Sequence, residues 1–193
     1  MSEPALSSMV MSPLRTDTFD LGGLRLTAGE GRRLDLYVDI GSFDLAGESY
    51  PVEPAAVPVR LDISRTTGDG YALRLRFEAS LAGPCMRCLD PAVPTFEIDV
   101  REVSQPNEAW GRGRNEDESD DLTSPYVQDG VLDLRGWARD ALALSVPANI
   151  LCRDDCAGLC PVCGANLNEA GPDHHHERPR DPRWAALSEI RFQ

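Results

Sequence analysis

The sequence predicts an α+β protein: an antiparallel sheet or small open barrel with one packed helix and a cysteine-rich, zinc-binding C-terminal segment. Three observations predict this class, namely apolar alternation with period two, one amphipathic stretch after it, and six cysteines in closely spaced groups. The 193 residues suffice for one sizeable core and a short appended module. Hydrophobic residues make up 41% and charged residues 26%, as is ordinary for a globular protein.

Four segments alternate apolar and polar residues, which is typical of antiparallel strands with one buried face. They span Leu34–Val38, Val57–Ile63, Leu73–Leu81 and Phe96–Val100. The turn residues Thr67-Gly68-Asp69-Gly70 predict a hairpin between the second and the third. We therefore expect a meander or small open barrel over residues 21–103.

A short strand over residues 126–132 and then a helix over residues 134–146 are expected next. Asp133 is a good N-cap, and Pro147 is a residue at which a helix stops. Apolar residues at i, i+3, i+4, i+7 and i+8 predict one buried face, made of Leu134, Trp137, Ala138, Ala141 and Leu142. We expect Trp137 to pack in the core.

Composition divides the chain further. We expect a flexible leader (1–18), a β-rich domain (19–150) interrupted by an acidic loop (104–124), a cysteine-rich metal-binding segment (151–168), and a polar linker with a terminal helix (169–193). The terminal helix would open at Asp181-Pro182, because proline is favoured at the first helical position. The acidic loop is interpreted as solvated, with docking of a basic partner as the alternative.

Charge and residue usage exclude several functions. The formal net charge is -13, and all 19 basic residues are arginine, so no lysine is present for a P-loop or a Schiff base. An acidic chain repels the phosphate backbone and is better matched to basic protein surfaces. The only histidines, His174, His175 and His176, form one run that we interpret as an exposed linker rather than as ligands or a rigidly held base.

No apolar run approaches the roughly 20 residues of a membrane helix, and the start does not resemble a secretory signal. We therefore expect no membrane association and a cytoplasmic location. In that reducing compartment disulfides are disfavoured.

The cysteines carry the strongest signal. Cys85 and Cys88 form one C-x2-C pair between two predicted strands, and the later group reads C-x3-C-x3-C-x2-C, made of Cys152, Cys156, Cys160 and Cys163. Two thiolates separated by two residues can both reach one zinc ion at about 2.3 Å. The pattern predicts a structural zinc site, and all six cysteines are candidate ligands.

One tetrahedral site uses four ligands, so two arrangements stay open. The four later cysteines could bind locally, or Cys85 and Cys88 could pair with two of them and staple the tail to the sheet. The second resembles the two-knuckle layout of zinc ribbons, with Cys160 and Cys163 as the preferred partners and Cys152 and Cys156 as the rival pair. Competing interpretations are disulfides, a redox dithiol, inert thiols and an iron–sulfur cluster.

The chain resembles the YceD-like family. The resemblance rests on Cys85-Met86-Arg87-Cys88-Leu89, on the string from Cys152 to Asn168 that contains Gly158-Leu159-Cys160-Pro161-Val162-Cys163-Gly164, and on Asp181–Leu187. It covers most of the chain from about Leu14. It implies a role in accumulation or processing of large-subunit ribosomal RNA, metal binding, and no established catalytic residue. Its members are bacterial, with plastid relatives.

Together these features predict a non-enzymatic accessory factor in large ribosomal subunit biogenesis with structural Zn²⁺. Its expected partner is a ribosomal protein, an assembly factor or rRNA of the large subunit, and no small-molecule substrate is expected. Direct RNA contact would need a local arginine patch, for which the candidates are Arg87, Arg153, Arg178, Arg180 and Arg183. The alternative is a thiol redox protein or sensor that uses Cys160 and Cys163. A ribonuclease is disfavoured because an all-thiolate shell leaves the metal no open position.

Overall fold

The computed structural model describes residues 15–105, 123–171 and 173–176. The predicted terminal helix, most of the predicted leader and most of the acidic loop lie outside these residues. So do Arg178, Arg180 and Arg183.

The main sheet is antiparallel, as predicted, and its long strands run side by side in the order β2-β5-β6-β9. A β-hairpin, β3 and β4, continues this sheet where β4 pairs with the end of β6. The strands are β2 (Gly31–Val38), β3 (Ser42–Leu45), β4 (Glu48–Glu53), β5 (Val57–Arg65), β6 (Tyr71–Leu81) and β9 (Thr95–Ser104).

The register of these strands sorts apolar and charged residues onto opposite faces. Leu61 lies opposite Leu75, which in turn lies opposite Val100, and these side chains contribute to the core. In the neighbouring pair of these two strands, Arg60 lies opposite Arg76 and faces outward. The predicted period-two alternation is therefore confirmed in the long strands.

A second, three-stranded sheet has the order β1-β11-β10, with β1 (Thr18–Asp20), β10 (Val127–Gln128) and β11 (Val131–Asp133). The single strand expected over residues 126–132 is thus a hairpin, because Asp129 and Gly130 both adopt positive φ and turn the chain back. Residues 15–18 of the expected leader also belong to the fold, since Arg15 bridges to Tyr37 and Thr18 begins β1. A short 3₁₀ helix, η1 (Gly22–Leu24), follows β1.

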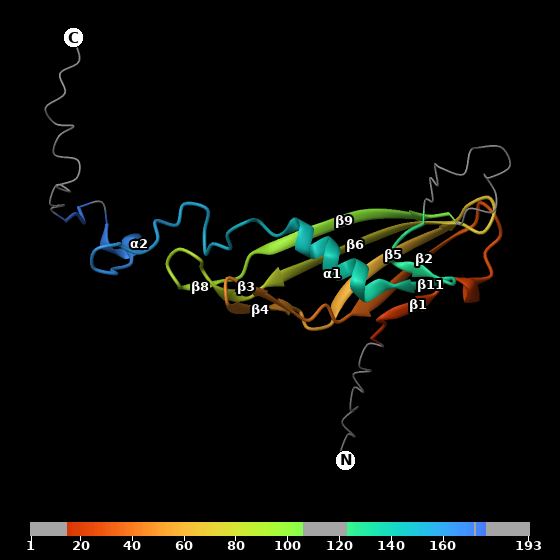
Figure 1. Cartoon of the computed structure of the whole chain (residues 1–193), viewed down its shortest axis with the longest axis horizontal. Coiled ribbons are helices and arrows are strands. Elements are labelled where there is room, and N and C mark those ends of the chain that lie inside the picture. Colours follow the sequence, from red (N-terminus) through yellow and green to blue (C-terminus); the bar gives the residue numbers. More distant parts are fainter. Residues whose placement is uncertain (1–14, 106–122, 172, 177–193) are drawn as a thin grey trace, which may run out of the picture.

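Helix α1 (Leu134–Ser145) packs against β9, β1 and β2 (Figure 1). Its N-cap is the predicted Asp133, whose side chain accepts a hydrogen bond from the backbone N–H of Gly136 at 2.9 Å. All five residues of the predicted apolar face are buried. Trp137 lies in the core, as expected, and stacks against the Tyr126 ring with 6.2 Å between ring centroids.

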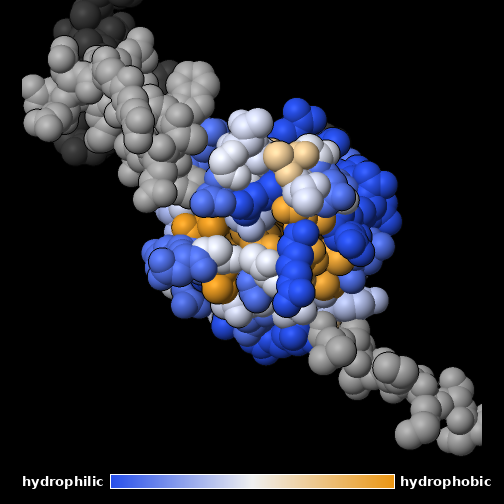
Figure 2. Space-filling view, turned by 90° about the vertical axis from the view of Figure 1, so that its right-hand side faces the viewer, coloured by the Kyte–Doolittle hydropathy of each residue, from blue (hydrophilic) through white to orange (hydrophobic). Residues whose placement is uncertain are grey.

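Over the described residues, the sheets do not join into a closed barrel, which agrees with the predicted antiparallel sheet or open barrel. Figure 2 views the end of the molecule farthest from α2 (Leu167–Ala170), where hydrophobic side chains are visible between hydrophilic rims. Among the described helices, none is both long and apolar enough to span a bilayer.

A two-stranded extension leads away from the sheet toward the cysteines. It consists of β7 (Gly83–Pro84) and β8 (Pro91–Ala92), and it extends the fold past the end of the main sheet in the direction of α2 (Figure 1). The Tyr50 hydroxyl donates a hydrogen bond to the Pro84 carbonyl at 2.8 Å, which fixes the extension to β4. The turn between β7 and β8 holds the first pair of cysteines.

Candidate metal centre

The turn between β7 and β8 is a knuckle that presents Cys85 and Cys88. The Leu89 N–H donates to the Cys85 carbonyl at 3.0 Å, and the Cys85 N–H donates to the Asp90 carbonyl at 2.7 Å. The Arg87 N–H points at the Cys85 sulfur, 3.5 Å away. Leu89 closes the turn in the left-handed region, with φ of 66°. These contacts aim both sulfurs toward one point.

The chain that follows α1 returns to this knuckle and supplies the next two cysteines. The backbone N–H of Met86 donates to the Ile150 carbonyl at 2.8 Å, and Ile150 is fully buried. Cys152 therefore lies two residues after Ile150, whose backbone is fixed to the first knuckle. The Arg87 guanidinium donates to the Cys156 carbonyl at 3.1 Å and holds the far end of the segment.

The sulfur atoms of Cys85, Cys88, Cys152 and Cys156 all lie within 4.8 Å of one another. Cys85 Sγ is 3.8 Å from Cys156 Sγ, and Cys88 Sγ is 3.5 Å from Cys152 Sγ. Four sulfurs placed about 2.3 Å from a tetrahedral ion are separated by about 3.8 Å, whereas a disulfide bond is about 2.05 Å long. All six cysteines are unbridged thiols, and three of this group are buried. The donor set fits a closed tetrahedral metal site.

The ionisation of the four thiols is uneven. Burial opposes ionisation of Cys85, yet hydrogen bonds from neighbouring backbone N–H groups outweigh it and lower its pKa to about 6. The Asn168 side chain, whose Nδ2 lies 3.4 Å from the sulfur, lowers the pKa of Cys156. Burial raises the pKa of Cys88 and of Cys152. Four thiolates this close together need the charge of a divalent cation, which deprotonates a coordinating thiol.

These positions decide between the arrangements left open by the sequence. Cys85 and Cys88 lie with the rival pair, Cys152 and Cys156, and not with the preferred Cys160 and Cys163. The four later cysteines are divided between two groups, with Cys160 and Cys163 in the other one. The backbone contact between Met86 and Ile150 brings Cys152 to the first knuckle before the chain reaches Cys160.

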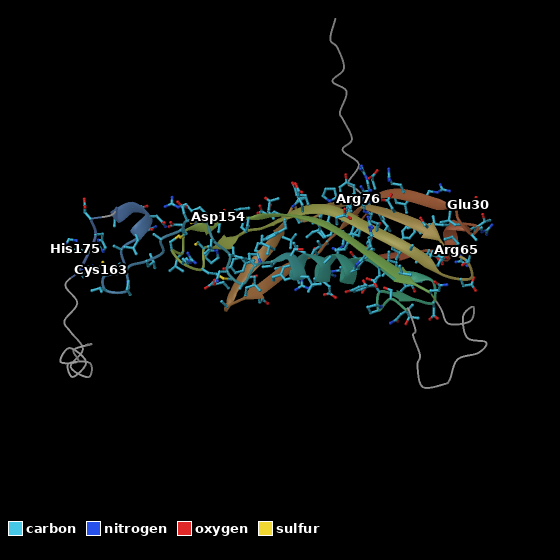
Figure 3. All side chains as sticks on the ribbon, turned by 90° about the horizontal axis from the view of Figure 1, so that it is seen from above. Glu30, Arg65, Arg76, Asp154, Cys163 and His175 are labelled. Atoms are coloured by element: carbon cyan, nitrogen blue, oxygen red, sulfur yellow. The ribbon has the colours of Figure 1, made fainter. Side chains whose placement is uncertain are left out.

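Cys160 and Cys163 lie instead in a second group with His174 and His176, again with all four ligand atoms within 4.8 Å of one another. The sequence predicted an exposed linker here; His175 and His176 are exposed, but His174 and His176 also lie among side chains that could hold a metal ion. His174 and His176 are separated by one residue, so both rings can turn to one side while His175 turns away. Figure 3 shows Cys163 and His175 at the end of the molecule farthest from Arg65.

Asn168 is a site residue that the spacing of the cysteines did not reveal. Its Oδ1 accepts hydrogen bonds from the Ala157 N–H and from the Arg153 guanidinium, both at 2.8 Å, and its Nδ2 donates to the Cys156 sulfur. Arg153 and Arg87, two candidates for RNA contact, thus have hydrogen bonds within the cysteine region.

The chain is similar to a known protein family and to several known proteins. Residues 73–191 match a protein family described as "Large ribosomal RNA subunit accumulation protein YceD". An uncharacterized protein of Mycobacterium tuberculosis is 31% identical over 97% of this chain and 86% of its own length. One from Mycobacterium leprae is 29% identical over 94% of this chain and 79% of its own.

A maize protein described as a chloroplastic large ribosomal RNA subunit accumulation protein YCED homolog is 27% identical over 77% of this chain and 57% of its own length. No solved structure matches the chain.

Proposed function

Because this chain belongs to the YceD family, we propose that it is a non-enzymatic accessory factor in large ribosomal subunit biogenesis that carries a structural zinc ion. The ligands of that ion are Cys85, Cys88, Cys152 and Cys156. The family description supports a role in large ribosomal subunit biogenesis. The convergence of the four sulfurs is the single observation that supports the zinc site.

The donor set supports a structural rather than a catalytic metal. Four thiolates fill a tetrahedral shell and leave no position for water or substrate, which a catalytic zinc requires. A bound ion would supply charge neutralisation and a cross-link between the sheet extension and the returning segment. The residues of this chain do the rest, because Arg87 and Asn168 fix the backbone and sulfur of Cys156.

The charge distribution favours a basic protein of the large subunit as the direct partner. The formal net charge is -13. On the outer face of the main sheet, Asp62 forms ion pairs with Arg33 and Arg76, Asp35 pairs with Arg60, and Asp99 pairs with Arg74. Arginines that are already paired attract phosphate weakly, whereas an acidic surface attracts a basic partner through charge complementarity.

The zinc site is tested on the tag-free, full-length protein purified under reducing conditions. Elemental analysis of Cys85→Ser/Cys88→Ser and of Cys152→Ser/Cys156→Ser should show one zinc ion fewer per chain than the wild type. The pair Cys160→Ser/Cys163→Ser is the matched control, because it removes two thiols and leaves this cluster intact; when loaded with Co²⁺ it should keep the absorption of a four-thiolate site, which the first two variants lose. An unchanged zinc content in either of the first two variants would refute the site.

The cellular role is tested by complementing a deletion strain and following precursors of the large-subunit rRNA. The wild type should restore mature rRNA, and Cys85→Ser/Cys88→Ser should restore it poorly. When the protein is affinity-purified with its partners, rising salt should release a basic large-subunit protein before the amount of co-purified rRNA changes. Nuclease-sensitive recovery of that protein would instead indicate rRNA as the direct partner, and normal rRNA in the deletion strain would refute the role.

A further inference from the structure

We propose that the chain has a second metal site, made of Cys160, Cys163, His174 and His176, that takes a tetrahedral divalent ion such as Zn²⁺. This site is separate from the four-cysteine cluster, and the proposal does not depend on the role in ribosome biogenesis. Two independent observations support it: the backbone around Cys160 repeats the first knuckle, and the histidine nitrogens lie where tetrahedral ligands belong.

The backbone of the second knuckle matches that of the first position by position. The Gly164 N–H donates to the Cys160 carbonyl at 2.8 Å, and the Cys160 N–H donates to the Ala165 carbonyl at 2.8 Å. The Val162 N–H points at the Cys160 sulfur, 3.5 Å away. Gly164 has φ of 74°, where the first knuckle has its left-handed residue. The same fold of the chain therefore presents a second pair of thiols.

The imidazoles complete the ligand set with tetrahedral spacing. Cys163 Sγ lies 3.5 Å from His174 Nε2 and 3.3 Å from His176 Nε2, and the two nitrogens are 3.2 Å apart. With zinc bonds of about 2.3 Å to sulfur and about 2.05 Å to nitrogen, a tetrahedron has S···N edges of about 3.5 Å and N···N edges of about 3.3 Å. These three atoms thus form one face of such a tetrahedron, and the Cys160 sulfur lies close enough to be the fourth ligand.

His175 marks the boundary of the site and provides a control. Its Nδ1 lies 2.8 Å from the carbonyl of Asp173, on its own loop, and it is not among the four clustered ligands. The alternation of inward, outward and inward rings is what two ligands at i and i+2 require on extended chain. Replacing His175 removes an imidazole of the same run without touching the predicted shell.

The two sites differ in exposure and in what they connect. Cys163 and His176 are exposed, whereas the four-cysteine cluster is mostly buried. The second site closes only the local loop from Cys160 to His176, although the Leu159 N–H donates to the Arg87 carbonyl at 3.2 Å and docks it beside the first knuckle. A chelator therefore reaches the second ion more readily, and this ion should leave first.

The test uses tag-free, full-length protein loaded with Zn²⁺ or Co²⁺. Elemental analysis should give two ions per wild-type chain, one for His174→Ala/His176→Ala and for Cys160→Ser/Cys163→Ser, and two for His175→Ala. The Co²⁺ absorption of the wild type should contain a Cys2His2 component that both double variants lose and that Cys85→Ser/Cys88→Ser retains. A metal chelator should remove the two wild-type ions in two phases.

Other results would refute the second site or its histidine ligands. One ion in the wild type, unchanged in His174→Ala/His176→Ala, refutes the second site and leaves the first in place. Two ions in that variant refute histidine ligation. A Cys160–Cys163 disulfide found by non-reducing mass mapping of freshly prepared protein refutes the second site in favour of a redox dithiol. Loss of metal only in Cys85→Ser/Cys88→Ser would support the first site alone.

Discussion

Gly83 is a position where one added methyl group should damage the connection between the sheet and the first knuckle. A Cβ at Gly83 would overlap Cδ1 and Cε1 of the Tyr50 ring and lie 3.0 Å from Cγ. Tyr50 is 1% exposed, and its hydroxyl donates to the Pro84 carbonyl at 2.8 Å. The ring therefore has to move for the methyl group to fit, and the hydrogen bond is lost when it does.

The expected loss in free energy of unfolding for Gly83→Ala follows from these contacts. Overpacking of a filled core costs about 1–3 kcal/mol. The part-buried hydrogen bond adds about 1 kcal/mol. Reduced entropy of the unfolded chain returns about 0.5 kcal/mol. The net loss is about 1.5–3.5 kcal/mol. Because β7 leads directly into Cys85, the variant should also release zinc from the first cluster at a lower chelator concentration.

Urea denaturation of the zinc-loaded protein under reducing conditions, followed by tryptophan fluorescence, measures this loss. Tyr50→Ala removes the ring, so adding Gly83→Ala to that variant should cost less than about 0.5 kcal/mol, which makes the double-mutant cycle strongly non-additive. A loss below about 0.5 kcal/mol for Gly83→Ala alone, or additive effects in the cycle, would refute the reasoning.

Four further substitutions test the knuckles and the charged sheet face. Leu89→Gly should raise the metal affinity of the first cluster several-fold in chelator competition, because a left-handed non-glycine residue costs about 1 kcal/mol and the Leu89 side chain is 66% exposed. Gly164→Ala should weaken the second site by a similar factor, since its Cβ meets nothing within 4 Å and only the positive φ is strained. Hydrogen bonding from Arg33 lowers the pKa of Asp62, so this carboxylate stabilises the fold above its unfolded pKa and the contribution is lost as the pH falls through its folded pKa. Asp62→Asn should therefore cost about 1 kcal/mol at pH 7 and progressively less as the pH falls below the unfolded pKa in urea titrations, and a loss that does not change with pH would contradict this. Arg87→Ala should lower the free energy of unfolding by about 1 kcal/mol through loss of its hydrogen bond to a cluster carbonyl, and should leave rRNA association unchanged.

The sheet and the helix were predictable because the spacing of apolar residues in the sequence matches the period at which a strand or a helix buries its side chains. In β6, every second residue from Tyr71 to Leu81 is buried, so the alternation survives over eleven residues. Along α1 the apolar spacing defines one face, and the cap at Asp133 marks its start. Where one face is buried, a shift of one residue would expose every apolar side chain, which makes such patterns reliable.

The short hairpins were missed because their strands are too brief to show a period. Ala46 and Gly47 join β3 to β4, and both adopt positive φ. Pro51 lies within β4, and proline argues against a strand unless the strand is at an edge. The Asp129-Gly130 pair is a recognised signal for a two-residue hairpin, so this turn could have been found from the sequence.

The choice of cysteine pairs could not be predicted because spacing carries no information about docking. Both later pairs can reach one ion, and loop-closure entropy differs little between them, since it grows only logarithmically with length. The deciding contacts join Met86 to Ile150, residues separated by 64 positions. Likewise, the run of three histidines hid the fact that only the first and third share a side of the chain.

The two knuckles explain why one has glycine at the left-handed position and the other has leucine. Strained backbone persists where the surroundings hold the chain in several ways at once. The first knuckle is held by β7–β8 pairing, by the buried Ile150 segment and by Tyr50, so Leu89 is kept at φ of 66°. Among the described residues, the second knuckle has no such strand pair beside it and is held by the Leu159–Asn166 bridge and by hydrogen bonds from Leu159 to Arg87 and from Asn166 to Asp90, and there the chain uses Gly164, which adopts this φ without strain. Metal at the second site would therefore do more of the ordering than metal at the first, which is why its loss should affect the loop from Cys160 to His176 and spare the sheet.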